Sequence, residues 1–147
     1  HNPGALVKLI IDYRQDKNFD TIESFIELIK PIMPQRNRIK YQAQVFQALR
    51  IEVNDEINSL NEFLDSTFHV LRQNGRLAVI SYHSLEDKAV KNLIKTGNSQ
   101  GNLQKDVFGR TDLPFKSINR RVIIPSEQEK IENARAKSAK LRIAEKL

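Results

Sequence analysis

The stretch from Gly75 to Lys95, GRLAVISYHSLEDKAVKNLIK, ends an apolar run on a histidine and begins a helical pattern directly after it. In open α/β sheets, ligands bind at the carboxyl ends of the strands, where the chain turns into a helix. His83 occupies that position, so its imidazole is a candidate for contact with a ligand. The alternative is a histidine that serves only structural contacts.

Ser84 and Asp87 follow the histidine in the spacing S-x-x-D. Helix N-termini use this spacing because a hydroxyl and a carboxylate satisfy the free backbone amides of the first turn. The pattern therefore predicts a helix cap at Ser84, completed by Asp87.

Arg50 and Asn54 lie one turn apart on a predicted helix and share a face that borders the apolar stripe at Val53. Their functional interpretation is an arginine and an asparagine that frame a cleft between two subdomains. The alternative is a solvated helix face on which Arg50 pairs with an acidic neighbour.

The carboxyl-terminal part of the chain is strongly basic. Between Lys116 and Arg142 the sequence holds eight Lys or Arg residues and three Glu residues. Such a cluster attracts polyanions, of which nucleic acid is the common one, although a lysine-rich surface for solubility is the alternative. Because no aromatic residues are interleaved, we expect contact with the phosphate backbone rather than base stacking. The candidates for this contact are Arg120, Arg121, Arg135, Lys140 and Arg142.

Several site classes are not indicated. The chain has no cysteine, and its three histidines are far apart in the sequence, so we expect no metal cofactor. No glycine-rich turn of the G-x-G type follows a strand, so no nucleotide fingerprint is present. Neither a membrane-spanning apolar run nor a leader peptide is visible, and we expect a soluble, cytoplasmic protein.

Hydrophobic periodicity predicts helices and strands in a definite order. Asp20 and Glu23 predict a capping box at the start of the second helix, and Ser126 with Glu129 predicts another. A single helix of about seven turns is expected from Gln44 to Gln73. The complete expectation is helices at 5–13, 20–30, 44–73, 85–95 and 125–133, strands at 76–82, 117–125 and 138–146, and loops at 31–40 and 96–117.

The segment RLAVISY is apolar on both faces, which is typical of a parallel strand covered by helices on both sides. An interior strand needs a paired neighbour on each edge, yet only two further strands are predicted, and both come later in the chain. The remaining strands of the sheet are therefore expected to lie outside this sequence.

Four segments in this order carry a resemblance: VFQALRIEVNDEI, GRLAVISYHSLEDKAVK, PSEQE and ENARAKSAKLRIAEK. Together they resemble the carboxyl-terminal half of the bacterial S-adenosylmethionine-dependent methyltransferases that modify the N4 amine of a cytosine in 16S ribosomal RNA. The resemblance implies an α/β fold. Residues 45–147 would be the carboxyl-terminal part of a Rossmann-like methyltransferase domain, with one parallel strand, a terminal strand pair and helices. Residues 1–44 would be part of a small helical insertion domain.

The resemblance also implies roles for particular residues. S-adenosylmethionine would be bound mainly by the missing amino-terminal half, so this chain alone would be inactive. His83 would orient the amine or accept its proton, with Ser84 and Asp87 beneath it as candidate catalytic residues. The RNA partner would be 16S ribosomal RNA in the small ribosomal subunit, contacted by Arg50, Asn54 and the basic cluster. A non-catalytic RNA-binding or ribosome-assembly module is the alternative.

Overall fold

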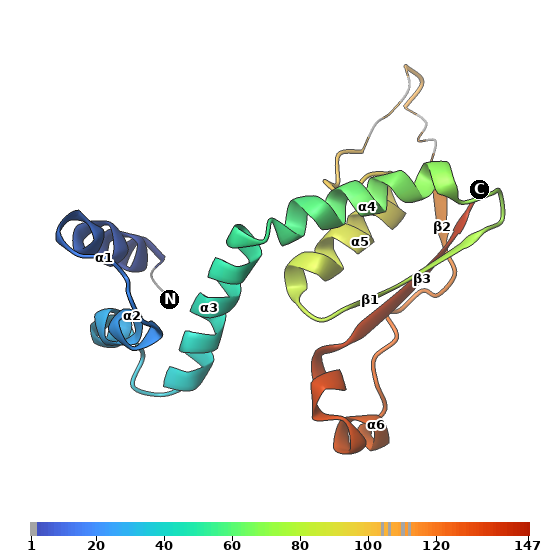
Figure 1. Cartoon of the computed structure of the whole chain (residues 1–147). Coiled ribbons are helices and arrows are strands. Elements are labelled where there is room, and N and C mark those ends of the chain that lie inside the picture. The colour runs from blue at the N-terminus through green and yellow to red at the C-terminus, as the bar shows by residue number, and fades with distance from the viewer. Residues whose placement is uncertain (1–2, 104, 106, 110, 112) are drawn as a thin grey trace. The chain divides into compact units, whose positions relative to one another are not determined.

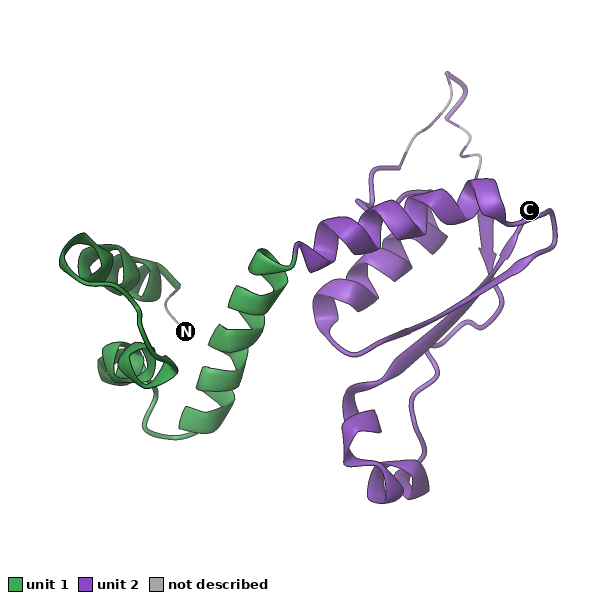
Figure 2. Ribbon diagram, viewed as in Figure 1, with its two compact units in different colours: residues 1–54 green, residues 55–147 purple. Residues whose placement is uncertain are grey.

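Residues 3–103, 105, 107–109, 111 and 113–147 are described by the computed structural model. The chain divides into two units, residues 1–54 and residues 55–147, which are coloured separately in Figure 2. This division lies at the end of a helix, whereas the boundary expected after residue 44 falls inside that helix. Each unit has its own hydrophobic core and is described by itself.

The elements of the first unit within residues 3–54 are helices. It contains α1 (Pro3–Asp16), α2 (Ile22–Ile29), a 3-10 turn (Lys30–Ile32) and α3 (Arg38–Val53) (Figure 1). The connector predicted at 31–40 is shorter in the structure, because α3 begins at Arg38. The buried residues come from α2, α3 and the turn between them, and they are Phe25, Ile29, Met33, Tyr41 and Val45.

The start of α2 differs by one residue from the prediction. Thr21 has an extended backbone, and its side-chain oxygen accepts a hydrogen bond from the backbone N of Ser24 at 3.1 Å. The predicted capping box of Asp20 and Glu23 is therefore wrong. The hydroxyl of Thr21 takes the capping role because the chain enters the helix one residue later than the acidic pattern suggested.

The single helix predicted from Gln44 to Gln73 is wrong, because the chain breaks it into α3 and α4 (Glu56–Val70). Asp55 has a left-handed backbone with φ of 51°, and its carboxylate accepts a hydrogen bond from the side chain of Asn58 at 2.6 Å. Aspartate and asparagine tolerate this conformation better than other residues with side chains. The break occupies so few residues that the spacing of apolar side chains continues across it.

The second unit is an α/β layer structure. It contains α4, β1 (Arg76–Ser81), α5 (Ser84–Thr96), β2 (Phe115–Ser117), α6 (Glu127–Glu132), a 3-10 turn (Ala134–Ser138) and β3 (Lys140–Lys146). Figure 1 shows α4 and α5 beside the sheet, and they share one core with it. The core residues are Leu64, Leu77, Ala89, Val90, Leu93, Ile94, Phe115 and Ala144. Within the described ranges, no helix is long and apolar enough to cross a membrane.

The sheet has the strand order β1-β3-β2, with β3 antiparallel to both neighbours. A terminal pair of strands was predicted, and β2 and β3 form such a pair. The strand predicted at 117–125 is wrong in position, because β2 ends at Ser117 and only Ile123 forms a further bridge, to Leu141. The predicted loop at 96–117 contains residues 104, 106, 110 and 112, which lie outside the described residues.

Within this chain β1 is an edge strand that pairs antiparallel with β3, so the expected parallel pairing is wrong here. The expected burial of β1 on both faces is not present in this chain, and its place inside a larger sheet stays a prediction. Leu77 is 9% exposed and packs in the core, whereas Ile80, on the opposite face, is 57% exposed. In the part of the chain that the structure describes, β3 is the one hydrogen-bonded neighbour of β1. The apolar run is buried on one side because α4 and α5 cover one side of the sheet.

Candidate functional site

The turn from β1 into α5 is closed by His83 and Glu86. The backbone of His83 is extended, and its Nδ1 accepts a long hydrogen bond from the backbone N of Glu86 at 3.4 Å. In return, Oε2 of Glu86 accepts hydrogen bonds from the backbone N of Tyr82 at 2.7 Å and of His83 at 3.2 Å. This reciprocal arrangement is a capping box in which a histidine takes the place of the usual hydroxyl residue.

The predicted cap at Ser84 and Asp87 is therefore wrong by one residue. Ser84 is the first residue of α5 and its side chain is exposed. Sequence reasoning missed Glu86, although a carboxylate three residues after His83 was a visible signal. The pattern of Ser84 with Asp87 was chosen instead, because it also places an acid in the first turn of the helix, one residue later than His83 with Glu86.

The capping bond constrains the imidazole of His83. An Nδ1 atom that accepts a hydrogen bond carries no proton, so the neutral ring holds its proton on Nε2. That Nε2 lies 3.1 Å from Oε1 of Glu86, and it is buried without a hydrogen-bond partner among the described residues. The side chain is 14% exposed, and the contact that the structure shows for it is the Nδ1 bond that closes the turn.

Asp87 joins α5 to β3. Its Oδ1 lies 2.7 Å from Nε of Arg142, and its Oδ2 lies 3.3 Å from Nη2 of Arg142 and 3.3 Å from Nζ of Lys140. The hydrogen bond from Arg142 lowers the pKa of Asp87 below its ordinary value, with further lowering by the positive charges and partial opposition from burial. Asp87 is therefore an ionised anchor between helix and sheet, and not part of the cap.

The register of the sheet explains why these cations face α5. Arg142 is paired with Val79 and Lys140 with Ser81, on the side of the sheet where Leu77 pairs with Ala144 in the core. Side chains of directly paired residues share a face. Ala139, Leu141 and Ile143 alternate with these cations in the sequence, so they lie on the face that points away from α4 and α5.

Lys146 forms a second link from β3 to the helices. Its Nζ donates to the carbonyl oxygens of Phe68 at 2.5 Å and Leu71 at 2.8 Å, at the carboxyl end of α4. A cation at this end of a helix is favourable because the last carbonyls carry partial negative charge. Basic residues of β3 thus fix both helices to the sheet.

The structure distributes the predicted RNA-binding residues over different places. It brings Lys140 and Arg142 together at Asp87, where their charges are engaged. Arg120 and Arg121 are exposed after β2, and Arg135 is exposed in the last 3-10 turn. Arg50 and Asn54 lie in the first unit, where the backbone N of Asn54 bonds the carbonyl oxygen of Arg50 at 3.0 Å at the end of α3.

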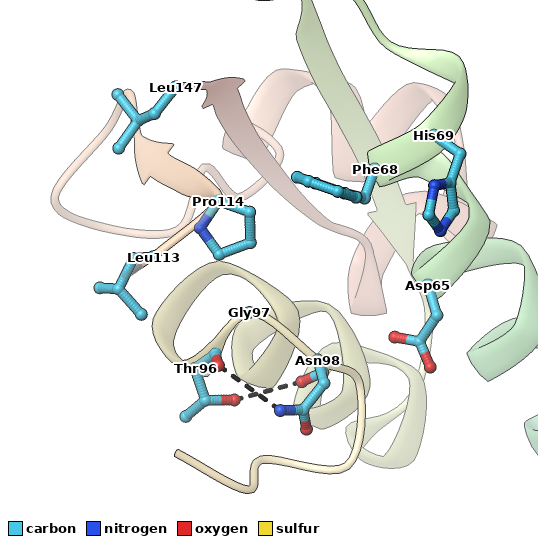
Figure 3. Close-up of a pocket in the computed structure, with 9 residues that line it drawn as sticks. All are labelled: Asp65, Phe68, His69, Thr96, Gly97, Asn98, Leu113, Pro114 and Leu147. Atoms are coloured by element: carbon cyan, nitrogen blue, oxygen red, sulfur yellow. Dashed lines mark hydrogen bonds between the residues drawn. The ribbon is translucent and has the colours of Figure 1, made fainter. Parts of the chain in front are cut away.

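A pocket of about 570 Å³ lies among the end of α5, α4 and the carboxyl terminus (Figure 3). Three of its polar side chains have partners. Both oxygens of Asp65 accept from Ser99, at 2.9 Å and 3.0 Å. The side chains of Thr96 and Asn98 bond to nearby backbone carbonyls, as the dashed lines of Figure 3 show in part. None of the predicted site residues lines this pocket. Its hydrogen bonds join neighbouring segments of the chain, which indicates a structural role.

Comparison with known proteins gives a match to a family described as the MraW methylase family over residues 5–147. The chain is 51% identical over 142 residues to the "Ribosomal RNA small subunit methyltransferase H" of Parabacteroides distasonis, covering 97% of this chain and 47% of that protein. Proteins of the same name match from Amoebophilus asiaticus (46% identity, covering 99% of this chain and 47% of that protein) and Bacteroides fragilis (48%, covering 99% and 48%).

The chain therefore spans about half the length of the curated relatives it matches. The match extends well beyond the four motif segments and includes nearly all of the first, helical unit. The resemblance inferred from the motifs is confirmed, and the chain belongs to the MraW methylase family.

Proposed function

We propose that this chain is the carboxyl-terminal part of a cytoplasmic methyltransferase that transfers a methyl group from S-adenosylmethionine to the N4 amine of a cytosine in 16S ribosomal RNA. The observation that carries the proposal is the family match over residues 5–147, together with relatives named as ribosomal RNA small subunit methyltransferases. The substrate RNA is the partner of the whole protein, in the small ribosomal subunit.

The exposed parts of the sheet support a Rossmann-like domain completed by an amino-terminal half. The outer edge of β1 has no ladder partner among the described residues, and the face with Ala78 and Ile80 is exposed. Unpaired strand edges and apolar sheet faces are unfavourable in water. In this proposal the missing half supplies the next strand and the second layer, and the first unit is the family's helical insertion domain.

The residues of this chain do not fit a binding site for S-adenosylmethionine at the tip of β1. The carboxylate of Glu86 is occupied by two backbone amides, and that of Asp87 is held by Arg142. No glycine-rich turn follows β1 to let a cofactor approach the backbone closely. We therefore assign the methyl donor to the amino-terminal half and expect this chain alone to be inactive.

Positioning is the role that we assign to the β1–α5 turn. The exocyclic amine of cytosine is a weak nucleophile because its lone pair is delocalised into the ring, so its rate of methylation depends on alignment. The base has to leave its stack to be reached. His83 holds the turn through its cap and Asp87 holds α5 on β3, which makes both positioning residues. Among the described residues, Ser84 makes no contact of this kind. The candidates for contact with RNA are Arg50, Asn54, Arg120, Arg121 and Arg135, whereas Lys140 and Arg142 bind Asp87.

The proposal is tested with a chimera that joins the amino-terminal half of the Parabacteroides distasonis relative to this chain. Methyl transfer from labelled S-adenosylmethionine into small-subunit ribosomal RNA is measured for the chimera and for each half alone. We expect transfer by the chimera only. A chimera that folds and binds the RNA without transferring methyl groups would favour the non-catalytic RNA-binding module.

A further inference from the structure

The outward face of α5 carries a row of lysines at Lys88, Lys91 and Lys95, which we call the α5 lysine row. Steps of three and four residues place them on one face of the helix, over about 10 Å at 1.5 Å per residue. All three are exposed, while Ala89, Val90, Leu93 and Ile94 on the other side of the helix are buried in the core. Figure 1 shows α5 beside α4, with both helices on one side of the sheet.

The charges of the α5 lysine row are not neutralised within the described residues. The two acids of α5 are turned elsewhere, because Glu86 caps the helix and Asp87 binds Arg142. No ion pair or hydrogen bond joins the three lysine side chains to another described group. In contrast, Lys30 and Lys130 each bind a glutamate three residues earlier in their helices.

Three uncompensated cations on one helix face repel one another, so they suit a polyanionic partner that lies along the helix. Lysine meets phosphate groups as a flexible point charge. No aromatic side chain lies within Ser84–Thr96, so base stacking is not indicated. The two basic residues of β3 nearest α5, Lys140 and Arg142, are already bound to Asp87.

We propose that the α5 lysine row binds the phosphate backbone of the ribosomal RNA substrate. This inference rests on the proposed function, and it adds a surface that the basic carboxyl-terminal cluster does not include. The row extends away from the β1–α5 turn along the helix, so it holds the RNA strand beside the turn that positions the target base. Its contribution is to RNA affinity and not to the chemistry at the amine.

The test uses the complete enzyme with Lys88→Gln, Lys91→Gln and Lys95→Gln combined. The dissociation constant for small-subunit ribosomal RNA is measured between about 50 and 200 mM salt. We expect affinity to weaken about tenfold and the salt slope to fall by about 2, because each contact to a single strand contributes about 0.7. The corresponding Lys→Arg triple variant keeps the charges and retains the affinity.

A matched control removes the same charge from the first unit through Lys8→Gln, Lys17→Gln and Lys40→Gln, three exposed lysines outside α5. An α5 variant that binds RNA no more weakly than this control would overturn the inference. Methylation by the unmodified enzyme is measured alongside. If the unmodified enzyme methylates RNA while the α5 variant binds RNA normally, the proposed RNA contact of the α5 lysine row is wrong and the proposed function stands. If the unmodified enzyme fails to methylate RNA while the α5 variant loses RNA affinity, the RNA contact of the α5 lysine row is supported and the proposed function is wrong.

Discussion

Asp87 and Arg142 join the first turn of α5 to β3, with Nε of the arginine 2.7 Å from Oδ1 of the aspartate. Their side chains are 14% and 22% exposed, so the pair is only partly screened by water. Because His83 and Asp87 belong to the same first turn region, the ion pair also fixes the β1–α5 turn relative to the sheet. This one contact couples the stability of the second unit to the proposed positioning of the substrate.

We expect Asp87→Asn to lower the free energy of unfolding by about 1–3 kcal/mol, between the values typical of exposed and buried pairs. A double-mutant cycle with Arg142→Met isolates the interaction, because the effects of each substitution that do not involve the partner cancel in the comparison. The measurement is urea denaturation of the chimera that joins the relative's amino-terminal half to this chain. Additive effects of the two substitutions would show that the pair contributes nothing.

The same pair predicts a dependence of stability on pH. The pKa of Asp87 in the folded protein is lowered, first by the hydrogen bond from Arg142, below its ordinary value of 3.8. The stabilisation is therefore complete above the unfolded-state pKa and is lost as the pH falls through the lowered folded-state pKa. Below about pH 4 the unfolding free energy of the unmodified protein should fall more steeply than that of Asp87→Asn, which cannot titrate. Parallel curves would contradict the assignment.

His83→Ala should remove the helix cap and cost about 1 kcal/mol of stability. It should also lower turnover more than RNA affinity, because the turn loses its fixed conformation. His83→Asn restores an oxygen that can accept the backbone hydrogen bond, so we expect it to recover both stability and most of the turnover. Thermal denaturation and steady-state methylation assays measure the two quantities.

Ser84→Ala is the matched control for the cap, and its effect on stability should stay within about 0.5 kcal/mol. A larger loss would show that the serine, and not His83, closes the helix. If His83→Asn were stable yet as slow as His83→Ala, the imidazole itself would take part in the reaction, and the positioning role would be wrong.

Gly97 ends α5 with a left-handed backbone, at φ of 83°, and an added Cβ would lie 2.8 Å from Cδ of Pro114. Gly109 is also left-handed, at φ of 77°, but an added Cβ would meet nothing within 4 Å. Gly97→Ala should therefore lower stability by about 1–3 kcal/mol, and Gly109→Ala by less. Thermal denaturation of both variants checks this, and equal losses would show that the contact with Pro114 is unimportant.

Much of the second unit could be predicted from the sequence because local patterns determine it. The apolar run at 76–82 is a strand, a helix begins directly after His83, and Ser126 caps α6 by accepting from the backbone N of Glu129. The family was recognisable because its motif segments lie in one order. These features depend on neighbours in the sequence, which periodicity and capping rules describe well.

The wrong predictions lie where two capping patterns overlap by one residue, or where contacts between distant parts of the chain determine the structure. At Thr21 and His83 the true cap lies one residue from the predicted one, because acids in adjacent frames give similar patterns. The turn at Asp55 was hidden because apolar spacing continues across it. The pairing of Asp87 with Arg142 depends on the register of β3 against β1, which no local pattern specifies. This register places Arg142, which the sequence suggested for RNA contact, in an ion pair with Asp87.

The most direct test of the account is the identity of the methylated nucleoside. Small-subunit ribosomal RNA is methylated by the chimera of the relative's amino-terminal half and this chain, digested to nucleosides and analysed by mass spectrometry. The account predicts that the new methyl group is found in N4-methylcytidine. A methyl group on another atom of cytosine, or on a different base, would contradict it.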